Sequence, residues 1–173
     1  MQYKQTQIGL TMIELLIVLM VAVILATIAG PSFAEFINNT RQTSALSQLT
    51  SDLNRARSEA IKRNSWVLVC ASNSTGTDCG TGTNWLNGWL VCYDKDTNGS
   101  CDLDDLAANP NPIVIRPALN ANLTLTGSAA FVRFNPSGTQ GTGGAATLTV
   151  NGNWTGAQSK VVNIAATGNI FRP

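Results

Sequence analysis

The chain has 173 residues, a usual length for a single domain. Only 12 % of them are charged, the formal net charge is +1, and there is no histidine. With so small a net charge, the protein as a whole has no electrostatic field that would attract nucleic acid or anionic lipid. Any such binding must therefore come from a local group of residues. Because Ser-His and Cys-His catalytic pairs need histidine, we do not expect an enzyme.

An apolar run from Leu10 to Ala29 has 20 residues, and its only charged side chain is Glu14. A helix of that length spans about 30 Å, the thickness of the hydrocarbon core of a bilayer. We therefore predict a transmembrane helix. A carboxylate inside such a helix costs roughly 2.5–3.5 kcal/mol, so it normally has a partner. The alternative is an ordinary anchor whose Glu14 lies in the headgroup region.

A short polar leader, residues 1–9, ends in Gly9 and is followed by Leu-Thr-Met-Ile-Glu-Leu-Leu. This junction resembles the prepilin-peptidase site of type IV pilins and type II secretion pseudopilins. The resemblance implies cleavage after Gly9, N-methylation of Leu10, and an assembly role for Glu14, paired with the α-amino group of a neighbouring subunit. The family usually has Phe where this chain has Leu10. The alternative is a conventional signal peptide that is cut after Ala34.

The helical pattern continues beyond the apolar run. Pro31 removes a backbone hydrogen bond, which predicts a kink, and the helix is expected to resume from Phe33 to about Arg63. One apolar stripe at helical spacing should pack on a sheet: Leu46, Leu49, Leu53, Ala56 and Ala60. The other faces carry polar residues: Arg41, Gln48, Asp52, Arg55, Glu59 and Lys62.

Beyond Asn64 the pattern changes to short β-type segments with turn residues between them. Their spacing of about 8–12 residues predicts an antiparallel sheet or sandwich, and with the helix an α+β fold. The expected strands are 66–70, 85–93, 113–115, 122–126, 130–135, 145–150, 160–165 and 169–172. Segments 145–150 and 160–165 are expected to pair with each other.

The four cysteines are Cys70, Cys79, Cys92 and Cys101. They form no close Cys-x-x-Cys pair, so we expect two disulfides made outside the cytoplasm rather than a zinc site. Three connectivities are possible. We favour Cys70–Cys79 and Cys92–Cys101, because each closes a short loop.

Four further motifs indicate which branch of these pilins and pseudopilins the chain resembles. They are ARSEAIKRN at 56–64, NGW at 87–89, FNPSG at 134–138 and TGNIFR at 167–172. Together they resemble the GspH/FimT family of minor pilins and pseudopilins. The resemblance implies a type IV pilin-like fold in which one long N-terminal helix packs on an antiparallel β-sheet domain. It divides the chain into a leader (1–9), a transmembrane helix half (10–30), an amphipathic half (31–63) and a β-rich head (64–173).

The same resemblance implies a single-pass protein of the bacterial inner membrane, with its head in the periplasm, that later enters a pilus or pseudopilus. Its expected partners are other major and minor pilins or pseudopilins, the prepilin peptidase and the inner-membrane assembly platform. The expected role is a subunit at or near the tip of a type IV pilus that helps to initiate assembly. The alternatives are a type II secretion pseudopilus subunit and a DNA-binding pilin for DNA uptake.

Residues 94–105 match the spacing of a calcium loop, with Gly99 at its sixth position. The candidate ligands are Asp94, Asp96, Asn98, Asp102 and Asp105. The last ligand position has Asp instead of the longer Glu, and no flanking helices are predicted. We therefore favour a polar turn held by Asx hydrogen bonds and a disulfide, and expect no cofactor.

The C-terminal run Gly168–Arg172 is the candidate DNA contact. DNA-uptake members of the family carry a Gly-Arg-x-Arg element in this region, and here only Phe171 and Arg172 could stack on a base or bind a phosphate. One cation and one ring are a weak combination. The favoured interpretation is an edge strand with Arg172 as a solvated cap, so DNA binding is not favoured.

Overall fold

The computed structural model describes residues 11–102, 112–141 and 145–173, without the side chains of 28–31. The chain divides into two compact units, Met1–Ile37 and Asn38–Pro173. We call residues 11–37 the anchor segment and residues 38–173 the head. The functional boundaries expected at residues 9, 30 and 63 stay predictions.

One helix, α1, runs from Met12 to Arg63. Thr11 caps its start, because the Thr11 hydroxyl oxygen accepts the backbone N–H of Glu14 at 3.3 Å. The helix ends where Asn64 adopts a left-handed conformation (φ 49°) and Ser65 N–H donates to the Ala60 carbonyl at 3.1 Å. The helix passes through Pro31. The side chain of Pro31 lies outside the described residues, so the kink stays a prediction.

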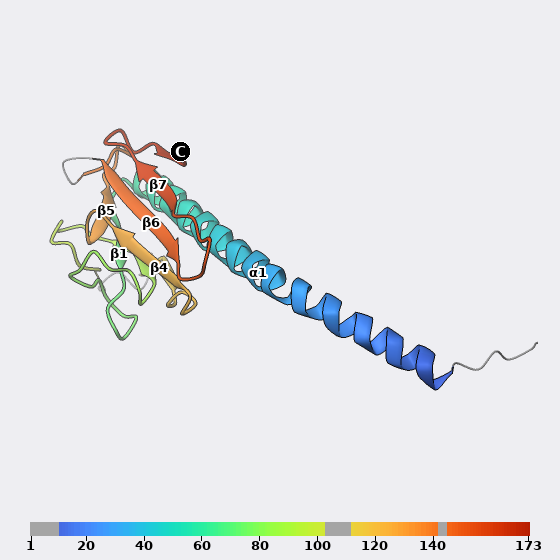
Figure 1. Ribbon diagram of the computed structural model, residues 1–173. Coiled ribbons are helices and arrows are strands. Elements are labelled where there is room, and N and C mark those ends of the chain that lie inside the picture. The colour runs from blue at the N-terminus through green and yellow to red at the C-terminus, as the bar shows by residue number, and fades with distance from the viewer. Residues whose placement is uncertain (1–10, 103–111, 142–144) are drawn as a thin grey trace, which may run out of the picture. The chain divides into compact units, whose positions relative to one another are not determined.

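Eight strands form two antiparallel four-stranded sheets in the head, with the orders β3-β2-β1-β5 and β4-β6-β7-β8 (Figure 1). Their bounds are β1 Val67–Ala71, β2 Trp89–Tyr93, β3 Val114–Arg116, β4 Leu123–Gly127, β5 Phe131–Phe134, β6 Ala146–Gly152, β7 Lys160–Ile164 and β8 Ile170–Phe171. The α+β class is confirmed, as is the pairing of β6 with β7. Seven of the eight predicted strands lie within two residues of the observed bounds.

The exception is the second predicted strand, which was expected to begin at Trp85. Residues 85–88 instead form a turn in which Gly88 N–H donates to the Trp85 carbonyl at 3.1 Å. Gly88 has a φ of 89°, and a side chain there would come within 2.1 Å of the Arg116 carbonyl oxygen. The close approach of this turn to the end of β3 therefore requires a glycine and delays the start of β2.

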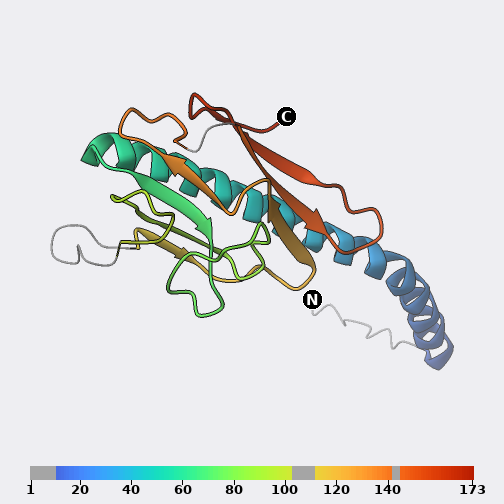
Figure 2. The same cartoon turned by 90° about the vertical axis from the view of Figure 1, so that its left-hand side faces the viewer.

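The predicted apolar stripe of α1 lies in the core. Leu46, Leu49, Leu53, Ala56 and Ala60 are all buried in one cluster with side chains from both sheets. Figure 2 shows the strands gathered around the later turns of the helix. Fully burying a leucine stabilises a fold by roughly 1.5–3 kcal/mol, so this stripe is a main contact between helix and sheets.

Candidate functional site

The anchor segment carries its apolar side chains on the outside. Every large apolar side chain from Met12 to Leu25 is at least half exposed, and α1 is long and apolar enough to cross a membrane. Glu14 lies in the first helical turn, where the positive end of the helix dipole favours a carboxylate. Thr11 and Glu14 thus have the spacing of a capping box, in which the bond that the structure shows runs from the Glu14 backbone N–H to the Thr11 hydroxyl. Gly9 and Leu10 lie outside the described residues.

Asp52 is a connection between α1 and the first sheet. The sequence places it on a polar face of the helix, and that prediction is wrong, because its side chain is buried. Arg116 donates to both Asp52 oxygens, at 2.8 and 3.0 Å, and the Trp89 indole N–H donates at 3.0 Å. The hydrogen bonding to Asp52 raises the pKa of Arg116, so the guanidinium stays charged. A helical carboxylate thus joins β2 and β3 to α1.

Three of the four family-like motifs meet at Arg57 of α1. Its Nε donates to the carbonyl of Gly138, in the FNPSG motif, at 2.9 Å. Gly168, in the last motif, lies against the same carbonyl, because a side chain there would come within 2.0 Å of the Gly138 oxygen. Asn135 shapes the FNPSG turn by accepting the N–H groups of Ser137 and Thr139, each at 3.0 Å. These motifs therefore position two loops on the helix.

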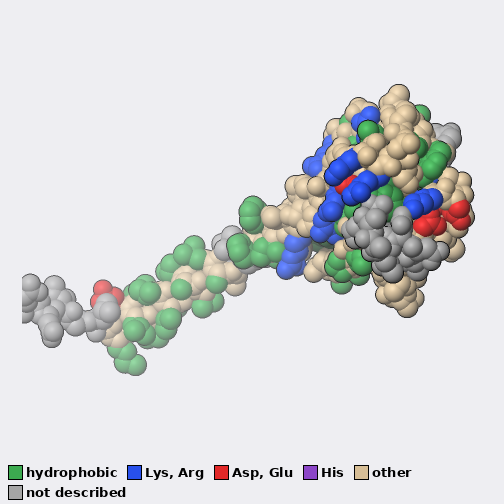
Figure 3. All heavy atoms as spheres, turned by 180° about the vertical axis from the view of Figure 1, so that it is seen from behind, with side chains coloured by type: hydrophobic (Ala, Val, Ile, Leu, Met, Phe, Trp, Pro, Cys, Tyr) green, Lys and Arg blue, Asp and Glu red, His purple; other side chains and the backbone are tan. Residues whose placement is uncertain are grey.

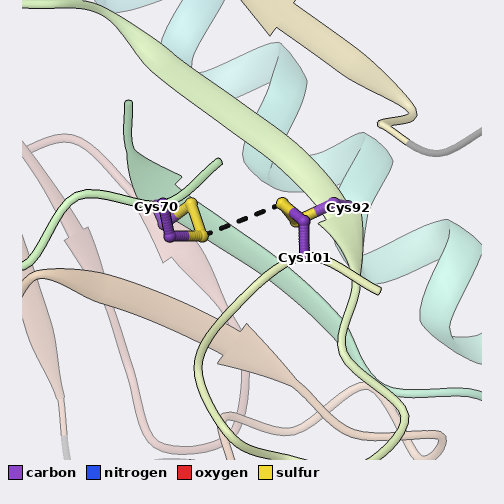
Figure 4. Close-up of side chains that lie close together, drawn as sticks. Cys70, Cys92 and Cys101 are labelled. Atoms are coloured by element: carbon purple, nitrogen blue, oxygen red, sulfur yellow. Dashed lines mark hydrogen bonds between the residues drawn. A yellow bond between two sulfur atoms is a disulfide. The ribbon is translucent and has the colours of Figure 1, made fainter. Parts of the chain in front are cut away.

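The two disulfides have the predicted connectivity. Cys70 is bonded to Cys79 and Cys92 to Cys101, each pair nine residues apart in sequence. Cys70 and Cys92 lie on β1 and β2, and their bridges lie side by side in Figure 4. Each bridge therefore joins a strand to the loop that follows it, β1 through Cys79 and β2 through Cys101.

The described part of the candidate calcium loop has the hydrogen bonds of a polar turn. Asp96 accepts the backbone N–H of Asn98 at 3.1 Å, and Asn98 accepts that of Ser100 at 2.7 Å. Asp102 accepts the backbone N–H of Lys95. Asp105 lies outside the described residues. These Asx bonds favour the turn interpretation, and calcium binding stays a prediction.

Asp94, the first candidate calcium ligand, is fully buried and lies 2.8 Å from Nε of Arg133. Burial raises the pKa of Asp94, and the positive charge of Arg133 opposes that rise without cancelling it. Arg133 also donates to the Thr97 carbonyl at 3.0 Å and lies over the ring of Phe131, 5.1 Å from its centre. The pair therefore ties the loop to β5.

Arg172 is held by the head. Its guanidinium donates to the Thr50 hydroxyl at 3.1 Å, the Leu46 carbonyl at 3.4 Å and the Ser47 hydroxyl at 3.5 Å. Strand β8 lies at the edge of its sheet and Arg172 is exposed, as predicted for an edge strand with a solvated cap. The bonds to α1 are an addition to that prediction, because they fasten the chain end to the helix. Phe171 is nearly half exposed. Because a phosphate would have to compete with the helix for Arg172, DNA binding stays a disfavoured prediction.

A family model described as "Type II transport protein GspH" matches residues 45–168. The chain belongs to the GspH family. Membership confirms the resemblance to GspH/FimT-type pilins, makes the chain a type IV pilin-like subunit, and implies interaction with other pilins and membrane anchoring. The family is one of structural subunits, in agreement with the expectation that the chain is not an enzyme.

Two crystal structures of the type IV minor pilin FimU from Pseudomonas aeruginosa (strain PAO1) share the fold of this GspH-family chain. The structure in space group P21 is 21 % identical with a TM-score of 0.61, and the match covers 80 % of this chain and 92 % of FimU. The structure in space group P65 is 20 % identical with a TM-score of 0.55, and the match covers 76 % of this chain and 91 % of FimU. This likeness confirms the type IV pilin-like fold. Among curated proteins none matches the chain.

The sequence reading missed some residues that position the GspH-type head. Gln42 is buried and donates to the carbonyls of Val150 and Gln158, at 2.9 and 2.7 Å. Gln42 and Asp52 both follow the stripe spacing, because Gln42 precedes Leu46 by four residues and Asp52 follows Leu49 by three and precedes Ala56 by four. A polar residue beside a helical core stripe is thus the signal that could have identified both.

Proposed function

We propose that this chain is a minor pilin that lies at or near the tip of a type IV pilus and helps to initiate its assembly. The observation that carries the proposal is α1, whose early turns form an exposed apolar span and whose later turns bury one apolar stripe against the β-sheets of the head. Such a helix can hold the subunit in the membrane and, after leaving it, pack beside the helices of other subunits.

The choice of the pilus rests on the solved relatives, because both are type IV minor pilins. The second candidate is a type II secretion pseudopilus subunit, which is supported by the description of the family model as a transport protein. Both machines use the same anchor and head plan, so the described contacts favour neither.

The route to the filament begins at the membrane. The prepilin peptidase cuts between Gly9 and Leu10 and methylates the new terminus, while the head lies in the periplasm. The two disulfides agree with that compartment, since such bridges form and persist where conditions are oxidising. The inner-membrane assembly platform then transfers the subunit to the growing filament.

Deleting the gene in the source bacterium separates the two candidates. We expect surface filaments to be strongly reduced while type II secretion continues at its normal rate, and the intact gene to restore the filaments. Gold-labelled antibody against the head should mark filament ends. Lost secretion with normal filaments would contradict the pilus assignment, and label along the whole filament would contradict the tip position.

Mass spectrometry of the membrane-bound protein tests the processing step. The expected chain begins at a methylated Leu10, and replacing Gly9 with a bulky residue should leave the leader attached because the side chain obstructs the peptidase. A mature terminus after Ala34 would identify an ordinary signal peptide and remove the basis of the proposal.

A further inference from the structure

A groove lies beside α1 in the head, between the helix and the loop that joins β3 to β4. Residues between 40 and 48 of α1 form one wall, and residues 117–120 form the other. Its volume is about 310 Å³, near the lower end of the range for ligand pockets. The groove therefore suits one or two side chains of a partner better than a whole helix.

The floor of the groove is apolar and belongs to the core of the head. Three of its lining residues, Ala45, Trp89 and Leu123, are at most 6 % exposed and are members of the core cluster. Leu119 packs against the same cluster. Because the core already holds these side chains, an apolar group can enter the groove without ordering them first, and its burial removes apolar surface from water.

The loop wall is held in place by hydrogen bonds. The Leu123 N–H donates to the Asn120 carbonyl at 2.8 Å, and the Asn122 N–H donates to the side-chain oxygen of Asn120 at 3.1 Å. At the other end of the loop, Gly88 lies against the carbonyl of Arg116. The groove is therefore formed by the head itself, before any partner arrives.

Two arginines line the groove, and only one of them is neutralised within the head. Arg116 is bonded to both oxygens of Asp52, which balances its charge. Arg41 is exposed, and in the part of the chain that the structure describes no carboxylate pairs with it. The groove thus combines an apolar floor with one uncompensated positive charge. A carboxylate next to an apolar side chain complements both features.

The helix wall adds polar groups next to Arg41. Ser44 and Gln48 follow it at steps of three and four residues, so the three side chains share one face of α1. Both are exposed, and neither side chain makes a hydrogen bond to another described residue. An apolar centre with polar groups around it is the usual plan of a protein–protein interface.

We propose that the groove holds an apolar side chain and an adjacent carboxylate of a neighbouring pilin subunit. The inference rests on the proposed function for its partner, because interaction with other pilins is what the GspH family implies. The place of the groove along α1 favours a subunit as the occupant. Its first residue, Thr40, lies within one helical turn of the end of the anchor segment, whose exposed apolar surface itself needs partners.

Cross-linking of the full chain in the source bacterium tests the proposal. A photoreactive amino acid at Gln48 should give a covalent adduct with another pilin or pseudopilin subunit. Mass spectrometry should map that adduct to an apolar residue close to an Asp or Glu of the partner. The control carries the photoreactive residue at Asn54, an exposed position of α1 that does not line the groove, and should give much less of this adduct. No adduct, or an adduct only with lipid or with proteins of another class, would overturn the proposal.

Charge reversal separates specific docking from chance proximity. Arg41→Glu places a like charge opposite the expected carboxylate and should lower the yield of the Gln48 adduct about tenfold. Arg55→Glu, at an exposed arginine of α1 outside the groove, should leave the yield unchanged. Urea unfolding should show wild-type stability for both variants, because neither arginine bonds to another described residue. Replacing the mapped carboxylate of the partner by arginine should restore the adduct of Arg41→Glu. An unchanged yield in Arg41→Glu would overturn the proposal.

The result is separate from that of the gene deletion. If the deletion spares the filaments and stops secretion, the pilus assignment fails, yet an Arg41-dependent adduct with a pseudopilin still supports the groove. If the filaments are lost but the adduct does not depend on Arg41, the pilus assignment holds and the groove proposal fails.

Discussion

The early and later turns of α1 have similar helical conformations and opposite surroundings. From Met12 to Leu25 the large apolar side chains are exposed, whereas the stripe from Leu46 to Ala60 is buried by the sheets. In Figure 3 hydrophobic side chains cover the early turns, and the head has a mixed surface on which Lys and Arg gather. An exposed apolar surface this large needs lipid or another protein. One part of the helix therefore completes the fold of its own chain, and the other needs partners outside it.

The strongest test of this contrast replaces Glu14. If the carboxylate pairs with the terminal amine of a neighbouring subunit, Glu14→Val should abolish entry into filaments, because that amine would be left unpaired among apolar helices. Membrane insertion should stay normal. Immunoblots of sheared filaments and of membranes measure both. Glu35→Gln, at an exposed helical glutamate, is the control. Normal incorporation of Glu14→Val would contradict the assembly role of Glu14.

The same substitution at two leucines compares the two parts of the helix directly. Leu49→Ala should lower the free energy of unfolding by about 2–5 kcal/mol, because it leaves a cavity in the core. Leu19→Ala, at an exposed position, should leave the unfolding of the head unchanged. Urea unfolding in detergent, followed by tryptophan fluorescence, measures both. Equal effects would mean that the anchor segment is part of the cooperative core.

A smaller effect is expected for the carboxylate that the head buries. Asp52→Asn keeps an oxygen for Trp89 but removes the charge that holds Arg116, so stability should fall by about 1–2 kcal/mol. The side chain of Arg116 is 37 % exposed, and solvent screening keeps the loss modest. Glu59→Gln, which weakens a half-exposed pair with Arg63, should change stability by less than about 0.5 kcal/mol. If Asp52→Asn leaves the stability unchanged, hydrogen bonding without the charge is enough to join α1 to β3.

The smallest effect concerns pH. Because burial raises the pKa of Asp94 above 3.8, the folded state holds this proton to a higher pH than the unfolded state does. The stability of the wild type relative to Asp94→Asn should therefore rise as the pH falls from 7 toward 4, through the raised pKa. Urea unfolding of both proteins at several pH values measures the difference. If the stability of the wild type relative to Asp94→Asn decreases as the pH is lowered, the positive charge of Arg133 outweighs the effect of burial on Asp94.

Local patterns predicted most of the fold. The stripe spacing identified five of the six apolar α1 residues in the described core, all except Ala45, because apolar side chains at steps of three and four share one face. Turn residues between β-type segments gave seven of the eight strands within two residues. The equal spacing of the cysteines favoured the observed bridges, since short loops close easily.

Contacts between distant segments could not be predicted in this way. Asp52 is predicted to lie on a polar face of the helix, yet it is buried against β2 and β3. Arg172 is exposed as predicted, but its hydrogen bonds to α1 were not predicted. Gly88 makes the second strand begin late because its turn lies against the carbonyls of residues 116 and 117. In each case the partner is at least 28 residues away in sequence, beyond the reach of local periodicity.

The sequence by itself determined the membrane-length apolar run and the α+β class, and its motifs and cysteine spacing favoured the family and the bridges that were found, because each depends on residue type at short spacing. Only the tertiary structure decided which polar groups join the helix to the sheets and that the two disulfides touch. The first depends on which strands pass the helix, and the second on the register of β1 against β2. A register fixes which residues face each other across strands, and no spacing along one strand contains that information.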